Sequence, residues 1–225
     1  MDKLAGMEKY QDKTSVKISK TYLFSKRVFD IFCGLVGFIV LLPIMFIVKI
    51  ATLLSGDKES IFFTQSRIGQ NGKEFKFYKF RSMVPNADEV LFELLKKDEK
   101  LAKEYKINKK LKKDPRITKV GAILRKTSLD ELPQVINILK GDMAVIGNRP
   151  YLPREKEDMG EYFDDIVSTK PGLTGLWQTA GTKKTTFAHR LLFESWYSRN
   201  MTMWLDIKIF FLTFKAVLFG HGAGI

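Results

Sequence analysis

The feature that most constrains this chain is an apolar stretch near its N-terminus. Residues 31–48 read IFCGLVGFIVLLPIMFIV, about 18 residues without a charge, which reaches the length at which a helix can cross a bilayer. A secretory signal peptide is a poorer explanation, because its apolar region is about 7–15 residues long and a small-residue cleavage site follows it. A buried helix of a soluble protein is the other alternative. The length and the lack of polar side chains favour a membrane helix.

Basic residues flank this stretch on both sides and constrain its topology. They are Lys17, Lys20, Lys26 and Arg27 before it, and Lys49 and Lys58 after it. Since Lys and Arg stay preferentially on the cytoplasmic side, both ends favour the same compartment. Pro43 removes a helical hydrogen bond and bends or breaks a helix. We therefore predict a re-entrant helix that enters the membrane, breaks at Leu42-Pro43 and returns to the same face, with an ordinary span as the alternative.

The composition narrows the function classes. The formal net charge of +13 indicates an anionic partner: a lipid surface, a phosphorylated substrate or nucleic acid. Nucleic acid is the weaker candidate, because no RNA-binding aromatic motif or zinc-finger spacing is present. The single Cys33 excludes an internal disulfide, and only two histidines are present. A metal should therefore be a hard ion held by oxygens, which indicates Mg²⁺.

The rest of the chain predicts a small hairpin and several helices. Residues 60–81 alternate aromatic and basic side chains around the turn signal Asn71-Gly72, with the phenylalanines packing or touching the membrane; a plain solvated hairpin is the alternative. A helix is expected from Pro85-Asn86 to about Lys113, and helical runs over 117–126 and 127–141 follow. The aromatic tail, residues 196–220, predicts an interfacial helix, with a core helix as the alternative.

The segment 127–134, TSLDELPQ, contains two adjacent carboxylates, Asp130 and Glu131. Ser128 and Glu131 have the spacing of a capping box, so a purely structural role at a helix start is one explanation. The other is catalysis. A helix N-terminus would hold Asp130 ionised, and an aspartate can accept a phosphoryl group covalently.

Basic residues lie near this acidic pair in the sequence, among them Arg125, Lys126, Lys140 and Arg149. Phosphoryl transfer needs mainly in-line positioning and positive charge on the non-bridging oxygens. Arginine forks supply that charge with fixed geometry, and Mg²⁺ can share it. The pattern is therefore compatible with phosphoryl transfer. A network of ion pairs that only stabilises the fold would contain the same residue types.

Three stretches resemble the bacterial sugar transferase family, the monotopic phosphoglycosyl transferases that begin polyprenyl-linked glycan assembly. They are YKFRSM (78–83), DPRITKVGAILRKTSLDELPQVINILKGDMAVIGNRP (114–150) and KPGLTGLWQ (170–178). The likeness runs from about residue 22 to the C-terminus. The tail is similar to that of members that transfer hexose 1-phosphates in exopolysaccharide, capsule or O-antigen synthesis.

The resemblance implies a chemistry for named residues. Asp130 would attack the β-phosphate of a UDP-sugar and release UMP, and undecaprenyl phosphate would then take the phosphosugar. Glu131 would assist Asp130 or the acceptor, and Mg²⁺ would contact Asp130. The implied phosphate ligands are Arg125 and Arg149, and Lys79 and Arg81 belong to a motif near the site.

Two departures from the family pattern affect these expectations. Asn148-Arg149-Pro150 stands where the family often has Pro-Arg-Pro, which keeps the arginine and should loosen the turn before it. The loop after TGLWQ usually ends in Gly-Arg, and here it reads Gly181-Thr182-Lys183-Lys184. Lys183 is then the candidate replacement, as a point charge without the bidentate geometry of arginine.

We therefore expect an α+β, mainly helical protein, with a re-entrant membrane helix, interfacial amphipathic helices and a small β-hairpin around a cytoplasmic catalytic site. The expected regions are a basic segment (1–21), the re-entrant helix (22–56) and a catalytic domain (57–225). The expected location is the cytoplasmic face of the bacterial inner membrane. The partners are a UDP-sugar, undecaprenyl phosphate and membrane lipid, without nucleic acid; a homodimer stays open. The alternatives are a basic membrane scaffold whose acidic pair only caps a helix, and a non-specific nucleic-acid binder.

Overall fold

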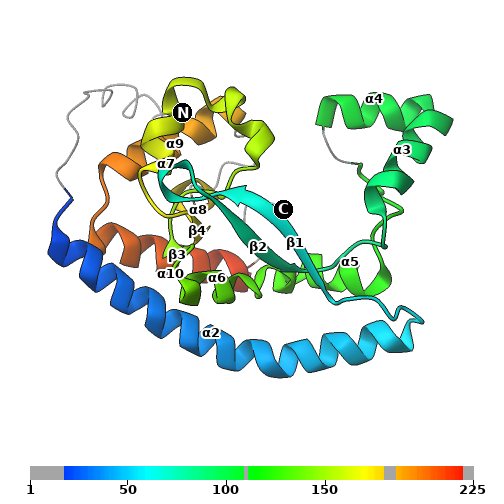
Figure 1. Cartoon of the computed structure of the whole chain (residues 1–225), viewed down its shortest axis with the longest axis horizontal. Coiled ribbons are helices and arrows are strands. Elements are labelled where there is room, and N and C mark those ends of the chain that lie inside the picture. Colours follow the sequence, from blue (N-terminus) through cyan, green and yellow to red (C-terminus); the bar gives the residue numbers. More distant parts are fainter. Residues whose placement is uncertain (1–17, 109–110, 180–185, 220–225) are drawn as a thin grey trace. The chain divides into compact units, whose positions relative to one another are not determined.

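The computed structural model describes residues 18–108, 111–179 and 186–219 (Figure 1). It divides into two compact units, which we describe separately. Unit 1 contains the described residues of 1–39, 64–77 and 134–225, and unit 2 contains those of 40–63 and 78–133. Helix α2 and the hairpin β1–β2 each contribute residues to both units.

The described residues form a mainly helical α+β fold, as predicted. The α-helices are α2 (Lys20–Leu54), α3 (Ala87–Lys97), α4 (Glu99–Asn108), α5 (Lys119–Lys126), α6 (Gln134–Lys140), α7 (Phe163–Val167), α8 (Leu176–Thr179), α9 (Phe187–Arg199) and α10 (Met203–Phe219). The strands are β1 (Phe62–Ile68), β2 (Glu74–Phe80), β3 (Ala144–Ile146) and β4 (Gly172–Thr174), in two sheets of two strands. Short 3₁₀ turns are η1 (Gln70–Gly72), η2 (Leu129–Glu131), η3 (Pro153–Glu155) and η4 (Glu157–Tyr162).

Helix α2 carries the apolar stretch and continues through Pro43. The chain therefore stays helical at Leu42-Pro43, where we predicted a break. An 18-residue window of α2 has a mean hydropathy of 2.9, and only 17% of that window is buried. By length and composition this helix can cross a membrane, whereas a core helix of a soluble protein would be mostly buried. The structure contains no membrane, so the re-entrant path stays a prediction.

Buried polar contacts attach α2 to the rest of unit 1. Lys26 Nζ donates to Asp206 Oδ2 of α10 at 2.6 Å and to the Ile146 carbonyl at 2.8 Å. The Arg27 guanidinium donates to the carbonyls of Ile138 and Leu139 at the end of α6. Two of the basic residues that we counted as free flanking charges are therefore used inside the fold, which weakens the charge argument for both ends lying on one side.

The core of unit 1 forms around a parallel pair of strands. β3 and β4 pair with Ala144 opposite Gly172 and Ile146 opposite Thr174. Ile138, Met143, Ile146, Tyr197 and Ile209, each at most 1% exposed, pack into one cluster there. Helix α10 contributes Ile209 to this cluster, and in Figure 1 α10 lies beside the β3–β4 sheet.

The tail helix α10 has a buried face and an exposed apolar face. Asp206 and Ile209 are each 1% exposed, whereas Trp204, Phe211 and Phe214 are 77%, 65% and 59% exposed. The core-helix alternative therefore describes one face of α10. The other face keeps the aromatic surface on which we based the interfacial prediction.

The hairpin forms where the turn signal predicted it. Asn71 and Gly72 both have positive φ, at 57° and 75°, in the turn between β1 and β2. Phe77 and Phe80 are 3% and 1% exposed, so these two side chains pack in the protein. The single helix expected from residue 85 to 113 is instead two helices, α3 and α4, separated at Asp98.

In unit 2, α5 packs directly against the chain that follows β2. A Cβ atom on Gly121 would lie 2.0 Å from the Ser82 carbonyl oxygen, so only glycine permits this approach. The Thr118 hydroxyl caps the helix by accepting the Gly121 N–H. This packing fixes the direction in which the last turn of α5 presents Arg125.

Candidate functional site

The acidic pair lies in the 3₁₀ turn η2 directly after α5. Ser128, before it, has a left-handed backbone (φ 56°), and its side chain makes no capping hydrogen bond. The predicted capping box is therefore wrong, because a residue in this conformation does not adopt the extended backbone of a normal N-cap. Asp130 is nevertheless 5% exposed, although it belongs to a residue type that is rarely buried unless paired.

Lys79 of β2 faces both carboxylates from within the same unit. Its Nζ lies 2.8 Å from Glu131 Oε1 and 4.0 Å from Asp130 Oδ2. Asp130 Oδ1 is buried and has no hydrogen-bond partner among the described residues. The site thus contains one neutralised carboxylate, Glu131, and one carboxylate oxygen that is desolvated without a partner.

Two arginines of unit 2 differ in how their side chains are used. Arg125 Nε donates to the Ser82 hydroxyl at 2.9 Å, and this guanidinium lowers the pKa of Asp130. Arg81 is held by the carbonyls of Ser60 and Met83 and by Asp57. The structure therefore brings Lys79 and Arg125 to Asp130 and gives Arg81 a set of structural contacts; its role with substrate stays a prediction.

Burial is the main influence on the protonation of Asp130. It raises the pKa of this carboxyl, Lys79 and Arg125 lower it, and Glu131 raises it. We expected a helix N-terminus to hold Asp130 ionised. The segment is instead a single 3₁₀ turn, so nearby cations rather than a helix dipole oppose the effect of desolvation.

The donor set is compatible with Mg²⁺ that is shared with a substrate. Among the described residues, no group of three or more His, Cys, Asp or Glu side chains could hold a metal. Mg²⁺ is commonly held by one or two carboxylates together with substrate phosphates and water. The unpartnered Asp130 Oδ1, next to the Glu131 carboxylate, provides oxygens of the required type.

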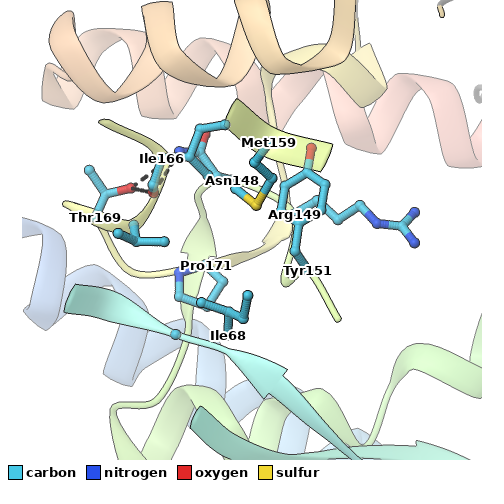
Figure 2. A pocket seen from close by; sticks show the side chains of 10 residues that line it. Ile68, Asn148, Arg149, Tyr151, Met159, Ile166, Thr169 and Pro171 are labelled. Atoms are coloured by element: carbon cyan, nitrogen blue, oxygen red, sulfur yellow. Dashed lines mark hydrogen bonds between the residues drawn. The ribbon is translucent and has the colours of Figure 1, made fainter. Parts of the chain in front are cut away.

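Arg149 belongs to unit 1, and the residue before it is firmly anchored. The Asn148 side-chain amide donates to the Ile166 carbonyl at 3.2 Å and to the Ser198 hydroxyl at 2.7 Å, and Asn148 is 2% exposed. We had expected the missing proline to loosen this turn, and these hydrogen bonds contradict that expectation. Asn148 and Ile166 are among the residues that line a cavity of about 10 Å³. Figure 2 shows the Arg149 side chain extending away from it. Lys183 lies outside the described residues.

The sequence interpretation missed a buried cluster next to Arg149. Glu194 of α9 is 1% exposed, and its Oε1 accepts the Arg149 backbone N–H at 3.0 Å. Arg190 lies over the Trp177 ring, with its guanidinium carbon 4.2 Å from the ring centre. A carboxylate inside the otherwise apolar run LLFESWY was the available signal, because such a residue is buried only with polar partners.

Comparisons with known proteins identify one family and several relatives. The family model described as bacterial sugar transferase matches residues 21–220. The chain is 46% identical over 200 residues to the undecaprenyl-phosphate galactose phosphotransferase of Salmonella typhimurium, covering 89% of this chain and 42% of that protein. It is 40% identical to the exopolysaccharide production protein ExoY of Sinorhizobium fredii, covering 88% of each.

A third relative is more distant. The UDP-glucose:undecaprenyl-phosphate glucose-1-phosphate transferase of Escherichia coli is 36% identical over 197 residues, covering 84% of this chain and 39% of that protein. The chain thus spans about two fifths of the length of the first relatives, 42% in each case. ExoY is a relative of similar extent, because 88% of both chains is aligned.

Proposed function

The chain belongs to the bacterial sugar transferase family, and on that premise we propose that it transfers a hexose 1-phosphate from a UDP-sugar to undecaprenyl phosphate. The names of the Salmonella and Escherichia coli relatives support this acceptor and this transferred group. The name of the Sinorhizobium relative supports a place in exopolysaccharide production. The reaction would be the first membrane step of such a synthesis.

In the proposed first step, a carboxylate oxygen of Asp130 attacks the β-phosphorus of the UDP-sugar. The bond between this phosphorus and the bridging oxygen breaks, and UMP leaves with that oxygen and its electron pair. Asp130 then carries the sugar phosphate as an acyl phosphate. In the second step a phosphate oxygen of undecaprenyl phosphate attacks the same phosphorus, which frees Asp130 and forms the lipid diphosphate sugar.

The observation that carries this proposal is the state of Asp130. Its Oδ1 is buried without a partner among the described residues, while Lys79 Nζ lies 4.0 Å from the other oxygen. A carboxylate that is poorly solvated is more nucleophilic than one in water, and the nearby cations favour its ionised form. A helix cap would instead use these oxygens on backbone N–H groups.

The surrounding residues would bind and orient the substrate. In unit 2, Arg125 is the proposed ligand of phosphate oxygens, and the family resemblance implies Arg149 and Lys183 as further phosphate ligands. Lys79 would hold Glu131 in place through their 2.8 Å contact and limit the repulsion between Asp130 and the incoming diphosphate. Asp130 would hold Mg²⁺ together with the substrate phosphates; when bound, this ion neutralises charge on the diphosphate.

The membrane arrangement is part of the same proposal. Helix α2 would enter the bilayer from the cytoplasmic side and return to it, and the exposed aromatic face of α10 would lie in the interface. This monotopic arrangement would keep the site at the cytoplasmic face of the inner membrane, where a water-soluble UDP-sugar and a lipid phosphate are both accessible.

The test is release of UMP by the purified full chain in detergent with Mg²⁺ and undecaprenyl phosphate. UDP-glucose, UDP-galactose and their N-acetylated forms are tried in turn. Asp130→Asn should abolish release, and Asp88→Asn, at an exposed position of the same unit, should not change it. Mass spectrometry of enzyme quenched without acceptor should find a sugar phosphate on the peptide that contains residues 127–134. If no modified peptide is found with any of these UDP-sugars, the covalent mechanism is refuted.

A further inference from the structure

Unit 1 contains a concentration of buried polar atoms that lack partners among the described residues. They are Arg149 Nε, Trp177 Nε1 and Arg190 Nε. Buried polar atoms in native proteins nearly always have a hydrogen-bond partner, so each exception needs an explanation. A group of three such donors on neighbouring segments indicates that the partner is a ligand.

These side chains form one connected cluster. Glu194 accepts the Arg149 backbone N–H at 3.0 Å, which fixes the segment that carries the Arg149 side chain. Both Arg149 and Arg190 lie near enough to the Glu194 carboxyl to lower its pKa, and the Tyr151 hydroxyl donates a hydrogen bond to this carboxyl. Arg190 is stacked on Trp177 of α8, with 4.2 Å between its guanidinium carbon and the ring centre.

The charges and donors of the cluster are suited to an anion. It has two guanidinium groups against one carboxylate, and neither arginine has an ion-pair contact within 4.0 Å among the described residues. Stacking on an aromatic ring occupies the face of a guanidinium and leaves its N–H edge available. The Trp177 N–H is a further donor.

We propose that Arg190, held on Trp177, forms with Arg149 a two-arginine phosphate subsite whose ligand is a phosphate group of the nucleotide. Glu194 fixes the segment that carries Arg149, because its Oε1 accepts the Arg149 backbone N–H. The inference rests on the proposed function only in taking the phosphate to be that of a nucleotide.

A lipid phosphate has the same chemistry, and the fold favours the nucleotide. Arg190 lies in the first turn of α9, about two turns before Tyr197, whose hydroxyl accepts a hydrogen bond from Lys26 of α2. The exposed apolar side chains of this unit are on α2 and α10. A phosphate subsite on α9 is therefore better suited to a water-soluble ligand.

The test is calorimetric titration of the full chain in detergent with UMP at fixed pH and Mg²⁺. Arg190→Gln and Arg149→Gln should each weaken UMP binding by about tenfold or more, since a charge-assisted hydrogen bond to phosphate is lost. Arg190→Lys should have an affinity for UMP between those of the unchanged protein and Arg190→Gln, because lysine keeps the positive charge and lacks the bidentate geometry of the guanidinium. Arg154→Gln, at an exposed arginine of the same unit, should bind within about twofold of the unchanged protein. Unaltered circular dichroism and melting temperature establish that each variant is folded.

The outcomes separate this inference from the proposed function. If folded Arg190→Gln binds UMP as tightly as the unchanged protein, the subsite is refuted, whether or not Asp130 carries the sugar phosphate. If instead Arg190→Gln loses affinity for undecaprenyl phosphate in a parallel titration and keeps that for UMP, the nucleotide assignment is wrong. UMP binding that is lost in Arg190→Gln and kept in Arg154→Gln supports the subsite even if no UDP-sugar is turned over.

Discussion

At the scale of single residues, Asp130 is subject to two opposing influences. Burial raises the pKa of its carboxyl, and the Lys79 ammonium, 4.0 Å away, lowers it. Arg125 acts in the same direction as Lys79. A nucleophile needs both influences, because desolvation increases the reactivity of the carboxylate and the cations keep part of it ionised.

Replacing Lys79 by Met should therefore move the acid limb of the pH profile of kcat/KM to higher pH. The substitution removes the larger of the two cationic effects that lower the pKa of Asp130, so the reactive carboxylate forms only at higher pH. We also expect about a tenfold loss of kcat/KM or more at neutral pH. Lys73→Met, at an exposed residue of the hairpin, is the control. An acid limb that stays in place would mean that Lys79 does not affect the group that titrates.

Glu194 makes the stability of the fold depend on pH. Burial raises the pKa of its carboxyl from 4.5 to about 7. A raised pKa means that the folded state binds more protons, so the stabilising contribution is complete below pH 4.5 and is lost as pH rises through 7. Between pH 5.5 and 8, the unfolding free energy should fall by roughly 2 kcal/mol more in the unchanged protein than in Glu194→Gln.

Denaturant unfolding in detergent at the two pH values measures this difference. Glu157→Gln, at an exposed glutamate of the same unit, should follow the unchanged protein. If Glu194→Gln loses stability with pH as steeply as the unchanged protein, another group is responsible.

At the scale of elements, the sequence predicts correctly those turns and helices that depend only on residues close together in the chain. Asn71-Gly72 adopt the positive φ that such a turn requires, so the hairpin could be placed correctly. The break between α3 and α4 was missed because Asp98 looks like one more charge on a helix. Its Oδ1 instead accepts the N–H groups of Lys100 and Leu101 and begins a new helix. The Ser128 capping box failed for the reverse reason: the spacing was right, but the backbone at Ser128 is left-handed.

Gly121→Ala should destabilise unit 2 although alanine is the better helix former. The propensity gain is about 1 kcal/mol. The added Cβ would lie 2.0 Å from the Ser82 carbonyl oxygen, which is backbone and can move away only if α5 separates from the chain after β2. Overpacking of this kind costs about 1–3 kcal/mol or more, so we expect a net loss and weaker UMP release, because Arg125 is displaced. Ala122→Ser, on the exposed side of the same helix, should change neither the unfolding free energy nor the rate.

At the scale of the whole molecule, the apolar helix and the family were readable from the sequence, and the pairing of distant charges was not. Lys26 and Asp206 are 180 residues apart and form a buried pair at 2.6 Å. No local pattern reveals such a pair, and Lys26 in the sequence has the same appearance as an interfacial lysine. Similarly, Glu194 and Arg149 come together only through the packing of α9. The candidate nucleophile could be identified from its motif, whereas its burial and its neighbours depend on tertiary structure.

The re-entrant path proposed for α2 predicts that both ends of the apolar stretch lie on the same side of the membrane. The continuous helix is compatible with this path and with an ordinary span. With Cys33 replaced by Ala, single cysteines at Lys20→Cys and Glu59→Cys lie at exposed positions on either side of the apolar stretch. Both should react from outside with a membrane-impermeant maleimide in inverted inner-membrane vesicles, and neither should react in intact spheroplasts. An ordinary span would make one of them reactive in each preparation.

Pro43→Leu restores the hydrogen bond that proline removes and should favour the ordinary span. If one cysteine becomes protected in inverted vesicles of this variant alone, Pro43 is the residue that turns the helix back.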